Sequence, residues 1–401
     1  MRLLQSILVQ LKQTKKPQHK FLTHLFGLLL MLPGQATFRN LSRYSPYHEK
    51  TFARWYARSF DFVALNQAAI TTAIPKTHEQ ALVIDASCVP KSGKQTYGLD
   101  RFWNGSHSRT EKGLEISALA WLDITDNCAY CLSVEQTPAT GEGTDQEATR
   151  IDIYLDQLTR VVSAHDLGSL RYVVSDGYYS KQKFLGGVRA LGLHQIGTLR
   201  ADATLRYLYQ GPKRPGPGRP KTDDGKVRWT DLSRFTLLGT DDEHIMLYHQ
   251  VVHHVQFRCP LRVVLVVDTT RNRRAVLFST DVGLDALTLY RSYKARFQIE
   301  FLFRDAKQFT GLTACQARAR AKLDFHFNAT LSAVNIAKLD TRQPRGHAAP
   351  SFSMASLKRR AFNQHLIERI CAPLANGHTL EKSSPEYEAL CNYGVITEVA
   401  A

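Results

Sequence analysis

Two short apolar runs, each ending in an aspartate, constrain the fold of this 401-residue chain more than any other feature. One run covers Ala81–Asp85 and the other covers Arg171–Asp176. Apolar runs of this length predict buried strands with an acid at the carboxyl end. In an open mixed sheet, these strand ends form the crevice where ligands bind. The sequence therefore predicts that Asp85 and Asp176 lie together at one edge of a sheet.

Further strand-like and helix-like stretches surround these two runs. Strands are predicted over Glu115–Ile124, Ala129–Thr137 and His194–Leu199, and helices over about Thr144–Ala164 and Ser180–Leu191. The resulting order is β-β-β-α-β-α-β, which is typical of an α/β fold built on a mixed sheet.

A third acid lies much later, in a helix-like run over Leu287–Phe309. This run also contains Tyr293, Arg296 and Lys307 around Glu300. Arg296 and Glu300 are one helical turn apart, and Glu300 and Lys307 are about two turns apart, so three of the four side chains share a face. A cationic stripe with one acid suits phosphates and a metal. The alternative is a surface helix with an ordinary pair between residues four apart.

The spacing of these four residues resembles the Y-R-E-K signature of bacterial insertion-sequence transposases, the cut-and-paste group of the DDE type. The resemblance extends over about residues 80–340. It implies a ribonuclease H-like catalytic core, in which a later helix carries the Glu of the triad. It also implies that Asp85, Asp176 and Glu300 are the catalytic, metal-binding residues, and that Tyr293, Arg296 and Lys307 contact DNA.

The chemistry of phosphodiester cleavage explains why three acids are needed. Two divalent ions about 3.5–4 Å apart activate the attacking oxygen and relieve charge on the leaving oxygen. Mg²⁺ prefers oxygen ligands, so Asp85, Asp176 and Glu300 suit two Mg²⁺ ions, for which Mn²⁺ can substitute. An aspartate at a strand end is also a common turn or helix cap. Asp123 and Asp268 end apolar strands too, and Asp268 is the stronger rival for the second acid.

The charge balance favours a polyanionic partner. The chain has 52 Lys and Arg against 36 Asp and Glu, a net charge of +16, and its isoelectric point is near 9.6. Such an excess is the electrostatic footprint of a nucleic-acid-binding protein. The resemblance implies double-stranded DNA, both terminal inverted repeats and target, and a homodimer in the synaptic complex.

Half of the positive excess lies in residues 1–80, which have 11 Lys or Arg and 3 Asp or Glu. Helical periodicity over Leu11–Leu32 and Thr51–Ala69, interrupted by turn residues, predicts a small helical domain over residues 1–75. We expect this domain to bind the terminal repeats.

Cations alternate with aromatic residues in the middle of this helical domain. Arg43, Arg54 and Arg58 stand among tyrosines and a tryptophan, a mixture that suits contacts to phosphates and grooves. The alternative is a solvated helix face whose aromatic residues belong to the core.

The segment 201–283 has a different character from its surroundings. It contains a run of Pro, Gly and basic residues followed by four strand-like stretches: Phe235–Leu238, His244–Val255, Leu261–Val267 and Ala275–Ser279. Asp176 and Glu300 are 124 residues apart, which is too far for a simple connection. The resemblance implies a β-rich insertion domain at this position.

Two short features of the insertion suggest DNA contacts. Trp229 lies in a basic stretch and suits stacking on an extruded base, while burial in the insertion's own core is the alternative. Gly218–Lys221 is similar to an A·T-hook core, although a linker explains four residues equally well.

The predicted catalytic core is thus split into residues 76–200 and 284–340. Residues 341–401 form a tail with a linker over Gln343–Pro350 and a basic helix over Met354–Ile370, suited to dimer or DNA contacts.

Other patterns limit the location and the cofactors. Phe21–Leu32 is apolar and mimics a signal peptide, but about a dozen residues are too few to span a bilayer. Seven scattered cysteines favour a reducing compartment, so we expect a cytoplasmic, nucleoid-associated protein. Cys128 and Cys131 form a lone C-x2-C without a second pair at zinc spacing. The histidines at 249, 253 and 254 are interpreted as strand residues.

The sequence therefore predicts a metal-dependent DNA transposase. The resemblance suggests a hairpin intermediate before attack on target DNA. A structure-specific nuclease or resolvase would need the three acids but not the Tyr293, Arg296 and Lys307 contacts. A DNA-binding regulator derived from a transposase would not need intact acids.

Overall fold

The computed structural model describes residues 2–11, 14–105, 108–138, 148–212, 221–239, 242–342, 352–375, 381 and 384–393. The predicted linker at Gln343–Pro350 lies outside these residues, as does all of the A·T-hook-like stretch except Lys221.

The centre of the molecule is a mixed sheet. Strand β1 (Gln80–Pro90) pairs antiparallel with β3 (Arg109–Asp123), and β3 pairs antiparallel with β4 (Cys128–Thr137). On its other side, β1 is parallel to β5 (Tyr172–Val174), which is parallel to β6 (His194–Leu199). The predicted mixed α/β architecture is confirmed. The strand order is consistent with the ribonuclease H-like arrangement that the resemblance implies.

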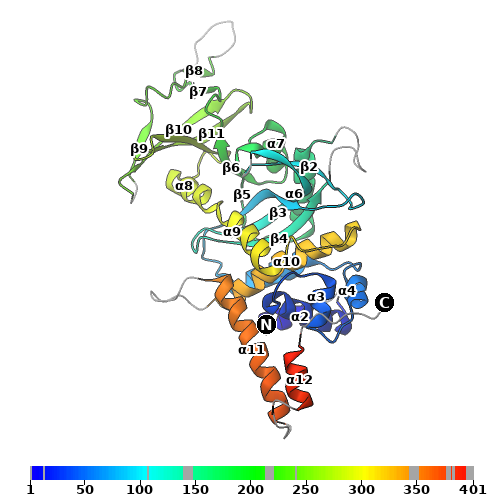
Figure 1. Cartoon of the computed structure of the whole chain (residues 1–401). Coiled ribbons are helices and arrows are strands. Elements are labelled where there is room, and N and C mark those ends of the chain that lie inside the picture. The colour runs from blue at the N-terminus through cyan, green and yellow to red at the C-terminus, as the bar shows by residue number, and fades with distance from the viewer. Residues whose placement is uncertain are drawn as a thin grey trace.

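The same sheet continues into the segment between Asp176 and Glu300 (Figure 1). The connection is the antiparallel pairing of β6 with β12. The sheet has 12 strands in the described residues, and the remaining ones are β2 (Asp100–Asn104), β7 (Leu205–Leu208), β8 (Asp223–Lys226), β9 (Thr236–Leu238), β10 (Ile245–His254), β11 (Cys259–Asp268) and β12 (Arg273–Ser279). The four strands expected after residue 230 are present, and the short strands β2, β7 and β8 were not predicted.

Helices cover both faces of the central sheet. Helices α6 (Arg150–Ala164) and α7 (Gln182–Ala190) pack on one face, in a hydrophobic cluster that includes Leu82 and Ile84 of β1. Alternate residues of a strand point to opposite faces. Ala81 and Val83 accordingly pack in a second cluster with the helices that follow residue 285.

The sequence predicted one helix-like run over Leu287–Phe309. The structure divides this run into several helical segments. Helix α8 (Ala286–Ala295) ends before Arg296, α9 (Gln298–Asp305) follows, and a π-helical turn covers Ala306–Thr310. At the junction, the backbone N–H of Glu300 donates to the carbonyl of Phe297, three residues earlier. The chain is therefore wound more tightly at the junction and more loosely in the π turn.

The N-terminal region is helical. Its five helices are α1 (Arg2–Gln10), α2 (Lys16–Met31), α3 (Phe38–Arg43), α4 (Glu49–Trp55) and α5 (Phe62–Ala73). The predicted helix over Thr51–Ala69 is in fact two helices, because α4 ends at Trp55 and Asp61 caps α5 by accepting from the backbone N–H of Ala64 at 2.9 Å.

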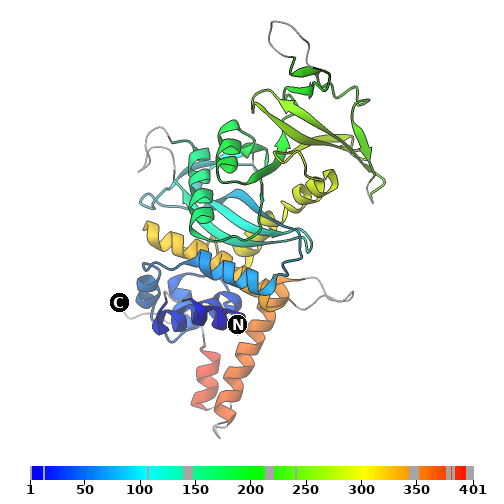
Figure 2. The same ribbon diagram turned by 180° about the vertical axis from the view of Figure 1, so that it is seen from behind.

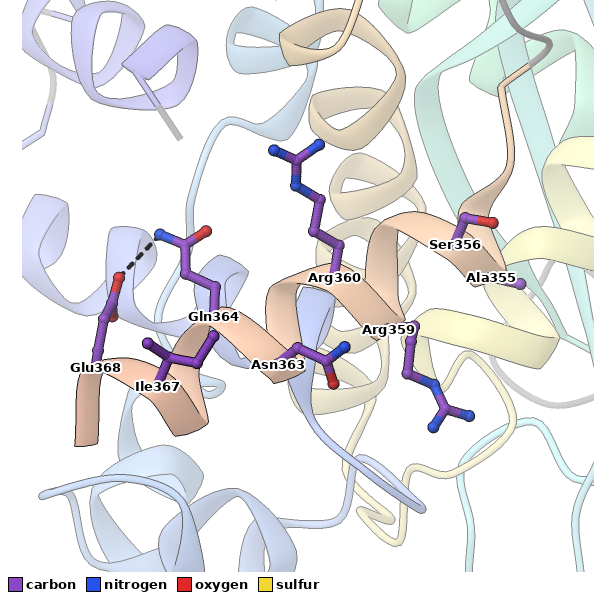
Figure 3. A pocket seen from close by; sticks show the side chains of 8 residues that line it. All are labelled: Ala355, Ser356, Arg359, Arg360, Asn363, Gln364, Ile367 and Glu368. Carbon is purple, nitrogen blue, oxygen red and sulfur yellow. Dashed lines mark hydrogen bonds between the residues drawn. The ribbon is translucent and has the colours of Figure 1, made fainter. Parts of the chain in front are cut away.

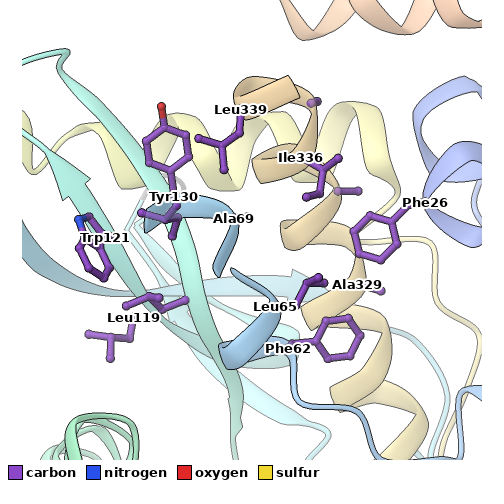
Figure 4. Close-up of a cluster of buried hydrophobic side chains, with 14 of the residues drawn as sticks. Phe26, Phe62, Leu65, Ala69, Leu119, Trp121, Tyr130, Ala329, Ile336 and Leu339 are labelled. Atoms are coloured by element: carbon purple, nitrogen blue, oxygen red, sulfur yellow. The ribbon is translucent and has the colours of Figure 1, made fainter. Parts of the chain in front are cut away.

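These helices pack on α10 (Arg320–Asp340), which separates most of them from the sheet (Figures 1 and 2). Figure 4 shows side chains from several elements in one core: Phe26 of α2, Leu65 of α5, Leu119 of β3 and Ile336 of α10.

The apolar stretch that mimics a signal peptide is part of this core. Phe21, Leu22, Leu25 and Phe26 of α2 are each at most 1% exposed. Among the helices in the described residues, none is long and apolar enough to cross a membrane.

Two helices follow α10 near the C-terminus. Helix α11 (Met354–Ala375) projects away from the rest of the molecule, and α12 (Pro385–Cys391) lies beside it (Figures 1 and 2). The predicted helix over Met354–Ile370 is thus present and extends one turn further.

Candidate active site

The sequence predicted Asp85 at the carboxyl end of its strand. This prediction is wrong, because Asp85 lies in the middle of β1. The apolar run stops at Asp85, but β1 continues to Pro90 because its second half pairs with β3. Asp85 and Val83 are two residues apart in β1, so their side chains point to the same face of the sheet. Val83 packs in the cluster that contains Ile299 of α9. The Asp85 carboxylate therefore points to the face of the sheet that α9 covers.

Asp176 lies at the carboxyl end of β5, as was predicted. It caps a short 3-10 turn over Gly177–Tyr179, where its Oδ1 accepts from the backbone N–H of Tyr178 at 2.9 Å. Strand β5 is parallel to β1, with Val174 beside Val83. Two residues further along each strand, this register places Asp176 level with Asp85.

The third acid is joined to the first by Arg296. The Arg296 guanidinium donates from Nη2 to Oε1 of Glu300 at 2.9 Å and from Nη1 to Oδ2 of Asp85 at 3.5 Å. The Arg296 side chain is only 15% exposed. Arg296 and Glu300 thus form more than a surface pair within one helix, because the same guanidinium reaches the sheet.

Tyr293 lies behind this arginine. The Arg296 guanidinium carbon is 5.9 Å from the centre of the Tyr293 ring. Burial raises the pKa of the Tyr293 hydroxyl, and the negative charge of Asp176 adds to this effect. Tyr293 is therefore a neutral hydroxyl close to the acids.

Lys307 lies further along the same face, in the π turn after α9. Its Nζ donates to Oγ of Ser87 at 2.8 Å. Ser87 is two residues after Asp85 and points to the same face of β1. Burial lowers the pKa of the Lys307 ammonium, so its positive charge lies in a partly dehydrated position where an anion would stabilise it.

The surroundings of Asp85 disfavour its negative charge. Burial, and next the charge of Asp176, raise the pKa of the Asp85 carboxyl from 3.8 to about 7. Arg296 and the backbone N–H of Ala86, which donates to Oδ1 at 2.8 Å, act in the opposite direction. Glu300 raises this pKa slightly. The three acids therefore interact electrostatically and carry more negative charge than Arg296 neutralises.

This donor set fits a hard divalent cation. All three side chains offer carboxylate oxygens, which Mg²⁺ and Mn²⁺ prefer. A cation bound there would offset the burial and the charge of Asp176 that raise the pKa of the Asp85 carboxyl.

A second group of acids has ligand atoms that lie closer together. Among the described residues, His78, Asp123 and Asp126 form the one group whose potential ligand atoms all lie within 4.8 Å of one another. Asp123 is one of the rivals considered from the sequence. Arg342 already occupies this group, with Nη2 at 2.6 Å from Asp126 and Nη1 at 3.5 Å from Asp123.

Asp268, the other rival, caps a turn. It ends β11, and its Oδ1 accepts from the backbone N–H of Arg271 at 2.9 Å. It lies in the part of the sheet beyond β12 and is not among the charged groups that shift the pKa of Asp85.

The predicted DNA-binding arginines of the N-terminal helices lie apart from the acids. Arg54 and Arg58 are exposed, and Arg43 is partly buried. The neighbouring aromatic residues belong to the core, since Trp55 stacks on Phe21 at 5.0 Å between ring centres. The Arg58 guanidinium carbon lies over the Trp55 ring, 4.2 Å from a ring centre.

Trp229 packs against a hydrophobic cluster that contains residues of the segment 201–283 together with Leu185 of α7 and Leu199 of β6. Its ring centre is 5.9 Å from that of Phe235, and it remains partly exposed. A stacking role for Trp229 stays a prediction.

The three histidines at 249, 253 and 254 lie in strand β10, as the sequence predicted. His254 is buried and stacks on Phe257 at 3.8 Å, and the backbone N–H of Phe257 donates to its Nδ1. Cys131 is buried and Cys128 is half-buried, and both are free thiols.

Sequence patterns did not reveal two residues of the site. Ser87 holds Lys307, and its position two residues after Asp85 in a strand was the available signal. Phe297 directly follows Arg296 and is 47% exposed, with its ring centre 5.1 Å from that of Phe301. An aromatic residue in a helix-like pattern is usually assigned to the core, so nothing in the sequence marked Phe297 as exposed.

Comparison with known protein families identifies the chain. The family described as DDE superfamily endonuclease matches residues 8–244, more than half of the chain. The matched segment includes Asp85 and Asp176 and ends before Glu300. No curated protein matches the chain. The chain therefore belongs to the DDE superfamily endonuclease family.

Proposed function

We propose that this protein is a DNA transposase that binds the terminal inverted repeats of its element, cleaves the ends and joins them to target DNA. Membership of a DDE endonuclease family supports DNA as the substrate. The observation that carries the proposal is the Arg296 guanidinium, which ties Asp85 of the sheet to Glu300 of α9. This contact joins two of the three candidate acids to a cation expected of a transposase.

In this proposal Asp85, Asp176 and Glu300 hold two Mg²⁺ ions, or Mn²⁺ in their place. When bound, the ions activate the oxygen nucleophile and stabilise the leaving oxygen of the phosphodiester. The carboxylates come from β1, from the loop that follows β5 and from α9. Rigid elements keep such ligands preorganised.

The nearby cations act on the DNA end. Arg296 keeps Asp85 and Glu300 together and offers its guanidinium to a phosphate, because planar guanidinium groups bind phosphate oxygens in pairs. Lys307 supplies a partly dehydrated ammonium. This group donates to Ser87, which lies two residues after Asp85 in β1. Tyr293 supports Arg296 and positions the backbone or a base.

The N-terminal helices supply the end-specific contacts. Arg54 and Arg58 are exposed on a surface whose aromatic residues are packed inside, so the cations and not the rings face a DNA partner. Arg43 lies at the end of α3, where its Nη1 donates to Asn40 at 3.4 Å.

Helix α11 supplies the contact between two copies in a homodimer. Ile367, Ile370 and Leu374 are 60%, 43% and 49% exposed on this helix. A groove of about 750 Å³ runs along it, and Figure 3 shows Arg359 and Arg360 leaving the helix on opposite sides. Exposed apolar residues on a projecting helix are typical of an interaction surface.

The insertion acts on the cleaved end. The freed 3′-hydroxyl attacks the opposite strand to form a hairpin, and a base extruded from the sharply bent end stacks on Trp229, which offsets part of the unstacking cost. Trp229→Ala should then slow hairpin formation and spare first-strand nicking. Unchanged hairpin kinetics in a folded variant would remove Trp229 from the mechanism.

The direct test of the function is an assay with DNA that contains both ends of the element. The wild-type protein with Mg²⁺ should nick at the ends and join them to a target plasmid. Asp176→Asn and Glu300→Gln should bind the ends nearly as the wild type does and lose cleavage by on the order of a thousand-fold. Asp268→Asn is the matched control and should cleave normally.

Other outcomes of this assay identify the alternatives. Cleavage that depends on DNA structure instead of the end sequence, without joining, indicates a nuclease or resolvase. Binding without cleavage by the wild type indicates a regulator derived from a transposase.

A further inference from the structure

A basic pocket of about 570 Å³ lies outside the site described above. It is formed by the segment 90–96, which follows β1, and by the segment 313–318, which precedes α10, together with Gln35. Lys91, Lys94 and Arg318 line it, and the other lining side chains include hydroxyl and amide groups. None of the lining residues, all of them in described segments, is an aspartate or glutamate.

The two walls of the pocket are joined by hydrogen bonds. Lys91 Nζ donates to the carbonyl of Cys315, and the backbone N–H of Tyr97 donates to the carbonyl of Arg318 at 3.0 Å. Gly93, at a φ of +100°, gives the first wall a turn that other residues rarely adopt. Lys112 donates to the Gly93 carbonyl at 2.7 Å. The pocket is therefore built before any ligand arrives.

Among the described residues that line the pocket, no aspartate or glutamate neutralises its positive charge. Burial lowers the pKa of the half-buried Lys91 ammonium, Cys315 acts in the opposite direction, and the charge of Arg318 lowers this pKa further. Arg320 provides a contrast two residues away, because its Nε is 3.6 Å from Asp324. A group of cations without acids, lined with hydroxyl and amide donors, suits an anion with several oxygens.

Both walls continue directly from the elements of the candidate active site. Along β1, six residues separate Asp85 from Lys91, or roughly 20 Å of extended chain. On the other side, the chain passes from Glu300 through Lys307 and Gly311 to the pocket. Lys307 is bonded to Ser87 between the two sites. The pocket thus lies on the line that runs from the acids past Lys307.

We infer that this pocket binds backbone phosphates of the DNA, roughly six nucleotides from the bond that is cleaved, since each nucleotide advances about 3.4 Å along the duplex. The inference rests on the proposed function and adds a second contact to it. Lys94 and Arg318 bind the phosphate oxygens, and Lys91 contributes its charge from the floor of the pocket. This contact fixes the register of the duplex relative to the acids.

The test compares a double variant, Lys94→Gln with Arg318→Gln, against Arg320→Gln. Both Lys94 and Arg318 are exposed, so the double variant should fold, and circular dichroism checks this. Binding to a mixed-sequence duplex is measured over a range of salt concentrations. The double variant should bind roughly ten-fold more weakly or worse at low salt. Its log–log salt slope should fall by about two, and that of Arg320→Gln should not change.

A second measurement locates the contact. A neutral methylphosphonate placed roughly six nucleotides from the mapped cleavage position should weaken wild-type binding and leave the double variant unaffected. Any of three results would overturn the inference. The salt slope of the double variant could be unchanged, Arg320→Gln could lose as much DNA affinity as the double variant, or the methylphosphonate could weaken binding by the wild type and the double variant equally. The proposed function would survive those results, because it is tested separately by whether the wild type cleaves the ends of the element and joins them to target DNA.

Discussion

Two groups of acids in this molecule each contain an arginine, and they differ in how completely their charge is neutralised. Around Asp123 and Asp126, the Arg342 guanidinium contacts both carboxylates, the His78 ring contacts Asp123, and the Asp123 side chain is fully buried. Around Asp85, Asp176 and Glu300, the salt bridges in the described part of the chain come from Arg296, which joins Asp85 to Glu300, and the Glu300 side chain is 41% exposed. The closely packed acids Asp123 and Asp126 therefore form a structural group. The candidate active site differs in that its acids carry more negative charge than Arg296 neutralises.

The largest expected effect concerns the neutralised group. Asp123→Ala should lower the free energy of unfolding by about 3–5 kcal/mol, because it removes a fully buried carboxylate that accepts from His78, Arg342 and the backbone N–H of Asp126. Urea denaturation measures this loss. Asp268→Ala is the matched control, with an expected loss below about 1 kcal/mol. If the two variants were equally stable, the Asp123 group would not be structural.

The next effect concerns the charge on Asp85 when no metal is present. Its pKa is about 7 in the folded protein and 3.8 ordinarily, so the folded state binds this proton more tightly. The resulting stability is fully present below about pH 4 and is lost as the pH rises to 7. Relative to wild type, Asp85→Asn should therefore gain roughly 2–4 kcal/mol between pH 4 and pH 8 in a chelator.

Unfolding curves of both proteins across this pH range provide the measurement. A constant difference between them would mean that Asp85 titrates as an ordinary surface acid. The account of excess charge at the site would then be wrong.

The smallest effect concerns Arg296. Arg296→Gln removes the cation that lowers the pKa of Asp85, so this pKa should rise by about one further unit. Metal binding requires the ionised carboxylate, so its pH midpoint should rise by the same amount. Arg304→Gln is the matched control, since Arg304 of α9 pairs with Asp305, its neighbour in that helix, at 2.9 Å. Equal midpoints for both variants would contradict the bridging role of Arg296.

The same comparison explains what the sequence predicted. Asp176 was placed correctly because an apolar run and its strand end together there. Asp85 was assigned to a strand end because the apolar run stops, while β1 continues through pairing with β3 that the local sequence does not encode. The break between α8 and α9 was missed because the helical periodicity continues through Arg296 and Phe297.

The structural role of Asp123 could not be read from its neighbours in the sequence. Its partners are His78, 45 residues earlier, and Arg342, 219 residues later. Only the folded chain brings these partners together. A strand-end acid is therefore a weak signal of catalysis until the charges around it are known.

Mn²⁺ binding to the folded protein, measured by isothermal titration calorimetry, tests the central claim most directly. The account predicts that Asp176→Asn and Glu300→Gln greatly weaken binding, while Asp126→Asn, in the group occupied by Arg342, binds as the wild type does. Loss of Mn²⁺ binding in Asp126→Asn, with normal binding in Asp176→Asn and Glu300→Gln, would contradict it.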